Sequence, residues 1–504
     1  MSSTFQADVC VIGGGVLGCM AARTLTRYQL KVLLIEKEND VCMGISRANT
    51  AIIYAGYDNK PDTLKSSLCV KGNMNFPFLC EELGVPISRC GSLMLCHGPR
   101  GAEVLKKKYE NGLQNHVSGL ELISGEEAHA LEPHLAGEIY MGLFSPNTAT
   151  VQPWEIGIAA FENALENGCE IRLSAKVTDI EKTDGGFRIT VSDTSAPKSS
   201  KTEVITARGI LNCAGVYADR VRELLLPPSV RIYPEKADYF IFDKTVKGFL
   251  SHIIFEEPEE KGKGLTLVPT VNGNLLAGPS AQGDCERDDF STSSDGLAFL
   301  EKHLGELLPE LPLSAVIRNF ASIRPNPFEV SQGENLEIIR SPRSIHSFVI
   351  DQPKDCPAFI SLIGIKTPGL TCCEELAKYI VRQLLPVLGN PPLNPNFHPR
   401  RESPVCMRRL SLSEKTSCIQ KDPSYGKIIC RCEQVSEGEI RDAISRGAKT
   451  VDGVKRRCGS GMGACQGSRC SYEITRLLAR ELNKPISEIC KDSSNSSFIK
   501  GDLT

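Results

Sequence analysis

The first forty residues constrain the fold of this chain more than any other stretch. A short apolar run over residues 8–12 leads directly into a glycine turn over 13–18. A stretch with helical character follows over 19–28, and a second apolar run over 31–35 ends on Glu36. This order of strand, G-x-G-x-x-G turn, helix, strand and acidic residue predicts a dinucleotide-binding βαβ unit. A G-x-G-x-x-G motif alone is often only a glycine-rich turn, but here the flanking strands and the acidic residue support the unit.

Each position of the motif has a physical task in such a unit. Gly13 allows the tight turn, Gly15 lets a pyrophosphate approach the backbone, and Gly18 lets the helix pack close to the strand. The helix N-terminus offers N–H groups and a positive dipole end to the phosphates. Glu36 lies about 20 residues downstream, where an acidic residue accepts hydrogen bonds from ribose hydroxyls.

Length and composition limit the class of protein. A chain of 504 residues is expected to form two or three domains. Lys plus Arg (58) nearly balance Asp plus Glu (61), and the formal net charge of -3 indicates no nucleic-acid partner. The first strand begins too early for a signal or transit peptide, and no apolar run reaches the roughly 20 residues of a membrane span. Most of the 21 cysteines are scattered singly at apolar positions, so we expect a soluble cytoplasmic protein without a transmembrane segment.

Apolar periodicity and turn residues predict the remaining elements. These are helices over 63–83, 103–111, 155–167 and 370–385, strands over 169–173, 175–180, 187–191 and 358–363, a strand that begins near 210, a hairpin turn at 184–186, and a polar loop over 192–202. Residues 226–330 are strand-rich and punctuated by proline and glycine, which indicates a separate sheet. The proline-rich stretch over 389–401 predicts a linker before a small module that extends to about residue 490.

The small module contains a cysteine pattern typical of a metal centre. Cys430 and Cys432 form a C-x-C pair, and Cys465 and Cys470 form a C-x4-C pair about thirty residues later. Four thiolates on two tight turns are sufficient ligands for one metal centre. The residue types alone leave zinc and a [2Fe-2S] cluster as comparable interpretations.

Larger stretches of the sequence resemble a known family. The N-terminal unit, the strand and turn over 211–219 and the loop over 364–371 resemble the glycine/D-amino-acid oxidase superfamily of FAD enzymes, over most of residues 5–385. Within it, residues 46–56 and 60–65 are most similar to the glycerol-3-phosphate dehydrogenase and L-2-hydroxyglutarate oxidase branch.

The cysteine pattern is similar to a second family. It resembles the bacterioferritin-associated-ferredoxin type of [2Fe-2S] domain, which is found fused to flavoproteins resembling anaerobic glycerol-3-phosphate dehydrogenases. This resemblance favours the cluster over zinc, with Cys430, Cys432, Cys465 and Cys470 as ligands and Cys458 as a nearby spectator. A cluster next to a flavin can also take its electrons singly, whereas zinc has no redox function.

The two resemblances imply an α/β fold with an α+β substrate domain. The expected parts are a discontinuous Rossmann-like FAD domain over 1–80, 150–225 and 335–395, an antiparallel-sheet substrate domain over 81–149 and 226–334, a linker over 396–425, a [2Fe-2S] domain over 426–490 and a polar tail over 491–504.

The resemblance also implies residues that hold the FAD. Gly13, Gly15, Gly18 and Glu36 would bind the ADP half, Ser46 and Asn49 would lie along the pyrophosphate and ribityl chain, Val177 would offer backbone groups to the adenine, and Gly364, Gly369, Leu370 and Thr371 would cover the isoalloxazine. A helix N-terminus at that last position would stabilise negative charge on a reduced flavin. Gly369 is equally compatible with a simple turn glycine.

Three residues are candidates for catalysis. Arg324 stands where the family places an arginine that binds the substrate anion, although it is also compatible with a surface arginine before a proline. Lys263 is a second anion anchor or a solvated loop lysine. Tyr54 replaces the histidine typical of this branch, and a phenol with a pKa near 10 is a poor general base at neutral pH. Tyr54 would therefore orient the substrate or pack against the ring, and the general base is left unassigned.

Two classes of function follow. The first is a FAD-dependent dehydrogenase that oxidises a small anionic CH–OH substrate, with glycerol 3-phosphate as first candidate and an L-2-hydroxy acid or an amino acid as alternatives. Its electrons would pass from flavin to cluster and then to an external acceptor, a protein or a quinone, and a partner subunit is compatible with this scheme. The second is a non-catalytic redox or metal-sensing module.

Overall fold

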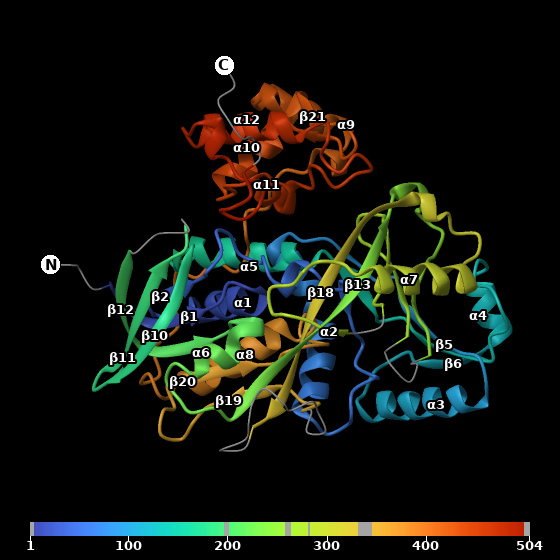
Figure 1. The fold of residues 1–504 in the computed structure, drawn as a ribbon, viewed down its shortest axis with the longest axis horizontal. Coiled ribbons are helices and arrows are strands. Elements are labelled where there is room, and N and C mark those ends of the chain that lie inside the picture. Colours follow the sequence, from blue (N-terminus) through green and yellow to red (C-terminus); the bar gives the residue numbers. More distant parts are fainter. Residues whose placement is uncertain (1–4, 196–200, 258–263, 281–282, 331–344, 498–504) are drawn as a thin grey trace.

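The computed structural model describes residues 5–195, 201–257, 264–280, 283–330 and 345–497. Figure 1 shows an α/β part that contains β1 and α1, a second sheet region around β5 and β13, and a small helical part formed by the C-terminal residues. The α/β class expected from the sequence is confirmed. No helix in these ranges combines the length and apolar character that crossing a membrane requires.

The first sheet is built on β1, whose apolar residues after Phe5 are buried. Strand β1 (Phe5–Ile12) runs parallel to β2 (Val32–Ile35) on one side and to β12 (Thr202–Asn212) on the other. The sheet continues with β9 (Glu170–Arg172) beside β2, with β20 (Phe359–Ile363) and β19 (Val349–Asp351) beyond β12, and with the antiparallel strands β11 (Gly186–Asp193) and β10 (Ala175–Thr183). A strand buried on both faces needs a continuous apolar run, which is what residues 9–12 supply.

Three helices pack together against this sheet. They are α1 (Val16–Leu25), α5 (Pro153–Glu166) and α8 (Cys373–Leu384), and their buried side chains share one core cluster with β1 and β2. The predicted βαβ unit is thus present, and the hairpin turn at 184–186 joins β10 to β11 as expected. Short helix α6 (Ala218–Arg222) follows β12, and the long helix α2 (Leu64–Leu83) contacts α8.

Several predicted boundaries were wrong. Helix α1 begins at Val16 rather than residue 19, because Gly15 takes an extended conformation and serves as its N-cap. Helix α8 begins at Cys373 rather than residue 370, because residues 367–372 form turns. Helix α3 (Pro99–Gln114) is longer than the predicted 103–111, since Pro99 is favourable in a first helical turn. The loop expected over 192–202 begins only after β11 ends at Asp193, and residues 196–200 lie outside the described ranges.

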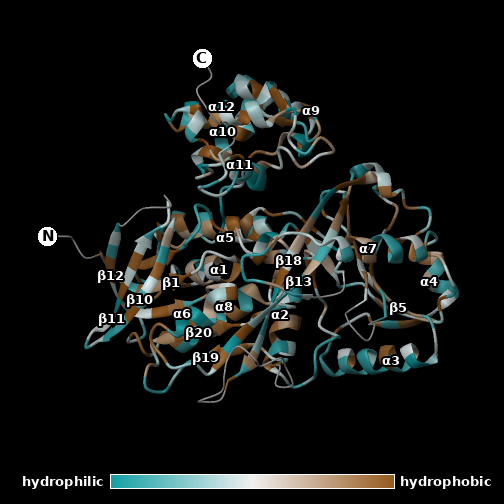
Figure 2. Cartoon of the chain, in the orientation of Figure 1, coloured by the Kyte–Doolittle hydropathy of each residue, from teal (hydrophilic) through white to brown (hydrophobic). Residues whose placement is uncertain are grey.

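The second sheet is mainly antiparallel, as expected for a substrate domain. Its order is β17 (Gly283–Asp284), β13 (Val230–Phe242), β16 (Leu275–Gly278), β15 (Thr266–Pro269), β14 (Ile253–Phe255), β5 (Ser92–Cys96), β7 (Met141–Ser145) and β6 (Glu121–Ser124), with β18 (Val316–Glu329) also paired to β13. Only the β14–β5 pair is parallel among these described strands. Helices α3, α4 (Gly125–Leu131) and α7 (Ser294–Leu307) lie around it, and α3 is largely hydrophilic in Figure 2.

A small third sheet is formed by segments that connect strands of the two large sheets in the sequence. It consists of β3 (Ile52–Ile53), β8 (Ala149–Val151) and β4 (Ile87–Ser88), with β8 in the middle. Because β3 lies directly before Tyr54, this sheet fixes the start of a segment that reaches the main cavity.

The C-terminal part has its own apolar core. Strands β21 (Ile428–Cys430) and β22 (Val435–Ser436) pack with helices α10 (Glu437–Ser445), α11 (Val451–Cys458) and α12 (Ser471–Glu481) around buried residues such as Ile440, Val454 and Leu478. The stretch 396–425, expected to be a linker, includes helix α9 (Leu412–Lys421), which begins with a capping box between Ser411 and Glu414. Figure 1 shows this part seated above α5.

The close packing of α1 on β1 gives the first prediction. A Cβ at Gly18 would collide with the carbonyl oxygen of Gly13, which is backbone and cannot rotate away. We expect Gly18→Ala to force α1 away from the strand and to lower the free energy of unfolding by about 1–3 kcal/mol, the usual cost of overpacking. The midpoint of thermal unfolding measures this effect.

The matched control is Gly305→Ala in α7. A Cβ at Gly305 meets no atom within 4 Å, so alanine should leave the midpoint unchanged or raise it, by at most about 1 kcal/mol of helix propensity. An unchanged midpoint for Gly18→Ala would contradict the proposed close approach.

Candidate functional site

A cavity of about 420 Å³ lies where the two large sheets meet. Its size is within the usual range for small-molecule and cofactor sites. The wall combines the start of α1, the segment around β3, strands β13 and β18, and the loop before α8. Its lining residues include Gly15, Val16, Ser46, Asn49, Thr50, Tyr54, Asp58, Lys108, Tyr239, Phe255, Ser322, Arg324, Lys366, Thr367, Gly369 and Leu370.

The N-terminus of α1 opens into one end of this cavity. Gly13 has φ +101°, and a Cβ there would lie 2.5 Å from the carbonyl oxygen of Cys213 at the end of β12. Gly15 and Val16 line the cavity, and the Val16 N–H donates to Ser46 Oγ at 2.9 Å. A Cβ on Gly15 would lie 3.2 Å from that same oxygen. The expected glycine positions and Ser46 therefore form a cradle at a positive helix end, which is suited to phosphate oxygens.

Glu36 lies beside the glycine turn at the end of β2. Its carboxylate accepts hydrogen bonds from the N–H of Gly14 at 2.5 Å and from the N–H of Glu38 at 2.9 Å. Burial raises the pKa of Glu36, and these backbone donors act in the opposite direction. The carboxylate is thus held in place next to the turn, where ribose hydroxyls are expected.

The other expected FAD residues differ in their placement. Asn49 lines the cavity, but its amide serves its own loop, since it donates to Ile45 O at 3.2 Å and accepts from Ala51 N–H at 2.8 Å. Val177 pairs with Val191 in the sheet and is not among the described residues that line the cavity.

The loop before α8 forms another wall. Gly369 and Leu370 line the cavity, whereas Gly364 lies behind it, with φ +65° and with its Cβ position facing Pro327. Thr371 is fully buried, and its hydroxyl accepts the backbone N–H of Tyr54 at 2.9 Å. This bond fixes the loop against the segment that carries Tyr54.

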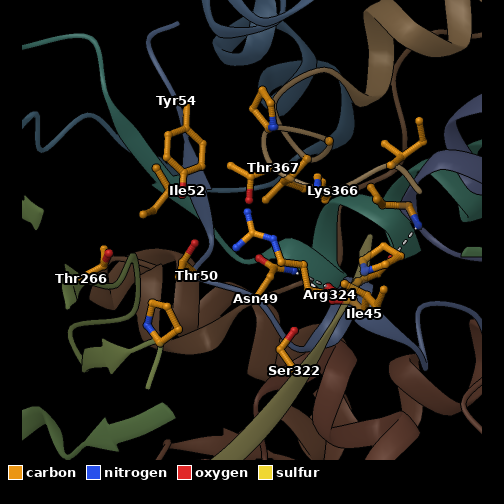
Figure 3. A pocket seen from close by; sticks show the side chains of 18 of the residues that line it. Ile45, Asn49, Thr50, Ile52, Tyr54, Thr266, Ser322, Arg324, Lys366 and Thr367 are labelled. Atoms are coloured by element: carbon orange, nitrogen blue, oxygen red, sulfur yellow. Dashed lines mark hydrogen bonds between the residues drawn. The ribbon is translucent and has the colours of Figure 1, made fainter. Parts of the chain in front are cut away.

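Arg324 reaches the cavity from β18. Along this strand Ala321, Ile323 and Pro325 are buried, so Arg324 and Ser322 project from the opposite face. Figure 3 shows the Arg324 guanidinium pointing into the centre of the pocket, near the Lys366–Thr367 loop. Its placement agrees with an anion-binding role rather than with an exposed surface arginine.

Lys366 was missed in the sequence, although it stands inside the loop that carried the family resemblance. Its ammonium group donates to Asn326 Oδ1 at 2.8 Å. Burial, together with the charges of Arg324 and Lys65, lowers the pKa of Lys366 to about 8. The cavity therefore contains two cationic side chains close enough to repel one another, and an anionic ligand would relieve this repulsion.

Tyr54 also lines the cavity and stacks on Phe255 with ring centroids 6.0 Å apart. Burial raises its pKa to about 12, and the contributions of Thr50 and Arg324 only partly offset this. The phenol therefore keeps its proton at neutral pH, so it can donate or accept a hydrogen bond there but is not a general base. No histidine is among the described residues of the cavity wall.

Two further cavity residues carried no sequence signal. Asp58 and Lys108 form an ion pair at the rim, although they are 50 positions apart in the chain and belong to different elements. Lys263, expected as a second anchor, lies outside the described residues.

The four expected ligand cysteines form two pairs in space, and each pair has one member from the C-x-C motif and one from the C-x4-C motif. The Sγ atoms of Cys432 and Cys465 are 3.6 Å apart, close to the separation of about 3.8 Å that bonds of about 2.3 Å to one tetrahedral metal would give. Cys430 hydrogen-bonds to Cys470, and this contact, with the backbone N–H of Gly461, lowers the pKa of Cys430. Such N–H donors stabilise thiolates and cluster sulfurs alike.

The two thiol pairs are compatible with a [2Fe-2S] cluster, which takes two thiolates on each iron. Cys458 differs from the four, because its thiol bonds to Val454 O at 3.3 Å and burial raises its pKa to about 12.

Comparisons with known proteins agree with both sites. Residues 8–383 match the family model described as FAD dependent oxidoreductase, and residues 428–480 match the model described as BFD-like [2Fe-2S] binding domain. The glycerol 3-phosphate dehydrogenase of Caloramator mitchellensis is 41% identical over 496 residues, and the match covers 98% of each chain.

More distant relatives match the larger part of the chain. The mitochondrial L-2-hydroxyglutarate dehydrogenase of Homo sapiens is 27% identical over 364 residues, which cover 64% of this chain and 78% of that protein. The structure of dithionite-reduced L-alpha-glycerophosphate oxidase from Mycoplasma pneumoniae with FAD bound has a TM-score of 0.69 and 25% identity. It covers 79% of this chain and 99% of its own.

The cysteine geometry gives the second prediction. We expect Cys430→Ser and Cys470→Ser to abolish the visible absorption of an iron–sulfur centre and to remove iron and acid-labile sulfide from the purified protein. Each variant removes one thiolate from a set of four, and the remaining three cannot complete both irons.

Cys458→Ser is the matched control and should retain iron and sulfide at the level of the unchanged protein. Loss of the cluster in Cys458→Ser with retention in Cys430→Ser would contradict the ligand assignment. Stoichiometric zinc without sulfide in anaerobically prepared protein would also contradict it.

Proposed function

Because this chain belongs to the family of FAD-dependent oxidoreductases, we propose that it is a dehydrogenase that oxidises the secondary alcohol of glycerol 3-phosphate. One observation supports this most directly. The cavity that begins at the phosphate cradle of α1 ends at the cationic pair Arg324 and Lys366, so one space joins a cofactor site to an anion site. When bound, FAD supplies the hydride acceptor and the [2Fe-2S] cluster supplies a one-electron carrier.

The cofactor would be held by groups that the fold already positions. Gly13, Gly15 and Gly18 let the pyrophosphate reach the α1 N-terminus, and Ser46 would donate its hydroxyl once phosphate takes over the Val16 N–H. Glu36 would accept the ribose hydroxyls. Asn49 would contribute indirectly, because its hydrogen bonds to Ile45 and Ala51 fix the conformation of the loop along the cofactor.

The remaining assignments follow the family pattern. Val177 would meet the adenine through its backbone, and Gly364, Gly369, Leu370 and Thr371 would enclose the isoalloxazine. The Tyr54–Thr371 hydrogen bond supports this part, since it holds the loop against the opposite wall. The thiolates of Cys430, Cys432, Cys465 and Cys470 would ligate the cluster.

The chain's own side chains would orient the substrate. Arg324 offers a planar pair of N–H donors, and Lys366 offers a second positive charge, so together they match the two negative charges of a phosphate ester. Tyr54 would donate its hydroxyl proton as a hydrogen bond to a substrate oxygen. Lys263 is retained in this proposal as a further anchor.

The alternative substrate is an L-2-hydroxy acid such as 2-hydroxyglutarate. It is suggested by the similarity of this chain to L-2-hydroxyglutarate dehydrogenase. Glycerol 3-phosphate is favoured because the relative that is 41% identical over 98% of each chain is a glycerol 3-phosphate dehydrogenase. In addition, a phosphate carries its charges on one group, which suits Arg324 and Lys366 in one cavity, whereas the two carboxylates of 2-hydroxyglutarate are separated by a carbon chain. The complete cavity and family membership favour an enzyme over a non-catalytic sensor.

The remaining partners belong to the same proposal. An external protein or quinone would accept the electrons, and Cys432 is exposed at the C-terminal part, where such a partner can approach. A cytoplasmic location is supported by the many buried free thiols, which persist in a reducing compartment.

The third prediction concerns substrate choice and Arg324. With a dye as electron acceptor, glycerol 3-phosphate should give a higher kcat/KM than L-2-hydroxyglutarate, lactate or any amino acid. Arg324→Met should lower kcat/KM for glycerol 3-phosphate on the order of 100-fold, about 2.7 kcal/mol, because a charge-assisted bidentate contact is lost.

Arg188→Met is the control, since Arg188 is exposed on β11 and pairs only with Glu181 among its described ion-pair partners. It should leave kcat/KM unchanged. Faster turnover of L-2-hydroxyglutarate would contradict the proposed substrate, and absence of turnover with FAD and iron present would favour the sensor.

The fourth prediction is a pH dependence. Lys366 is charged below its pKa of about 8 and neutral above it, so kcat/KM for glycerol 3-phosphate should fall as the pH rises through about 8. Lys366→Arg should move this fall beyond the alkaline end of the assay, since a guanidinium keeps its proton.

Lys366→Met should have a low kcat/KM at every pH and lose the inflection near 8. Steady-state kinetics between about pH 6 and 10 measure all three curves. An unchanged inflection in Lys366→Met would show that another group causes it.

A further inference from the structure

The C-terminal part contacts a loop of the α/β part, residues 39–47, which follows β2 in the chain. At its start, the Asp40 carboxylate accepts hydrogen bonds from Arg456 at 3.1 Å and from Arg457 at 2.8 and 2.9 Å. The side chains of all three are 5% exposed or less. A carboxylate and two guanidinium groups at this depth are tolerated only while they remain paired.

The far end of the same loop is held by a second contact. Arg47 pairs with Asp492 at 2.6 Å, and Asp492 also pairs with Arg456 at 2.8 Å. Asn39 donates to the backbone oxygen of Asp492 at 2.7 Å. Residue 492 was expected to belong to a polar tail, but its side chain closes a network around both ends of the loop.

Between these two ends the loop contacts the proposed cofactor cradle. The N–H of Cys42 donates to Gly14 O at 2.8 Å, inside the glycine turn. Ser46 accepts the N–H of Val16 at the first residue of α1. A shift of residues 39–47 would therefore displace groups that face the pyrophosphate position.

The arginines are equally close to the cysteine site. Arg456 and Arg457 are in the last turn of α11, which ends at Cys458 and is followed by Gly459 with φ +80°. Two residues further, the N–H of Gly461 donates to Cys430 Sγ at 3.5 Å. Ligation of the four thiols would fix the position of this turn. Because the turn directly follows α11, it would also fix the position of the last residues of that helix.

From this continuous set of contacts we propose that the ionic latch formed by Asp40, Arg456, Arg457, Arg47 and Asp492 couples the two cofactor sites. An assembled cluster would fix the position of the C-terminal end of α11. The ion pairs of Arg456 and Arg457 with Asp40 would then fix the loop over 39–47, and this loop positions Ser46 and the glycine turn for FAD binding. Cluster binding therefore tightens FAD binding, and by thermodynamic linkage FAD binding tightens retention of the cluster by the same factor. The proposal uses the two cofactors but not the substrate assigned above.

The test measures FAD affinity in the full chain with and without its cluster. Protein stripped of FAD is titrated with FAD, and binding is followed by quenching of flavin fluorescence. We expect removal of the cluster with a chelator and reductant to raise the Kd for FAD on the order of tenfold. Asp40→Asn should raise the Kd similarly with the cluster present and show no further rise when it is removed, because the latch is already broken.

Two additional variants keep the experiment decisive. Arg47→Met removes only the outer contact, whose side chains are partly exposed, so it should fold even if Asp40→Asn does not, and should reduce the effect of cluster removal. Glu473→Gln on α12 is the matched control, since its pair with Arg476 lies on the exposed surface, and should keep the full tenfold response.

The reciprocal measurement uses iron release to a chelator, which bound FAD should slow in the unchanged chain but not in Asp40→Asn. An FAD affinity that does not respond to cluster removal would overturn the coupling. A weakened Asp40→Asn that still shows the full tenfold response would reduce the latch to a structural contact. Neither outcome depends on whether glycerol 3-phosphate is the substrate, so failure of this proposal and failure of the proposed function are distinguishable.

Discussion

The structure depends on the approach of one helix end to one glycine turn. Helix α1 can begin beside β1 only because Gly13 and Gly18 have no side chains, and a Cβ at either position would meet backbone atoms. This approach directs the first N–H groups of α1 into the cavity, where Ser46 already accepts one of them. The site for a diphosphate is thus a consequence of backbone packing rather than of charged side chains.

The second sheet and the loop before α8 contribute the cationic side chains of the cavity. Strands β13 and β18 pair along most of their length and carry Arg324 to the cavity, while the loop before α8 brings Lys366 to the same place. Burial first, and then the nearby positive charge of Arg324, lower the pKa of Lys366, because two like charges in a partly buried space are unfavourable alone. A doubly charged substrate would compensate it, which connects an electrostatic conflict in the free protein to the choice of substrate.

The sequence was most informative where function depends on short spacings. The G-x-G-x-x-G turn, its terminal acid and the two cysteine pairs are local patterns, and their residues lie together as expected. Lys366 and the latch around Asp40 were not anticipated, because they depend on tertiary contacts that local spacing does not show. Lys366 bonds to Asn326, 40 positions away on another element, and Asp40 bonds to Arg457, 417 positions away. Helix starts at Val16 and Cys373 were also misplaced, since local propensity does not register the turns that precede them.

The central claim is that one chain oxidises a phosphorylated alcohol with a flavin and keeps an iron–sulfur centre in the same molecule. An anaerobic titration of the purified protein with glycerol 3-phosphate, followed by its visible absorption spectrum, tests it most directly. We expect the flavin band to bleach and the iron–sulfur absorption to decrease, with both complete at about 1.5 equivalents. Each substrate molecule gives two electrons, the flavin takes two and the cluster takes one. A spectrum that shows both cofactors and does not change with excess glycerol 3-phosphate would contradict it.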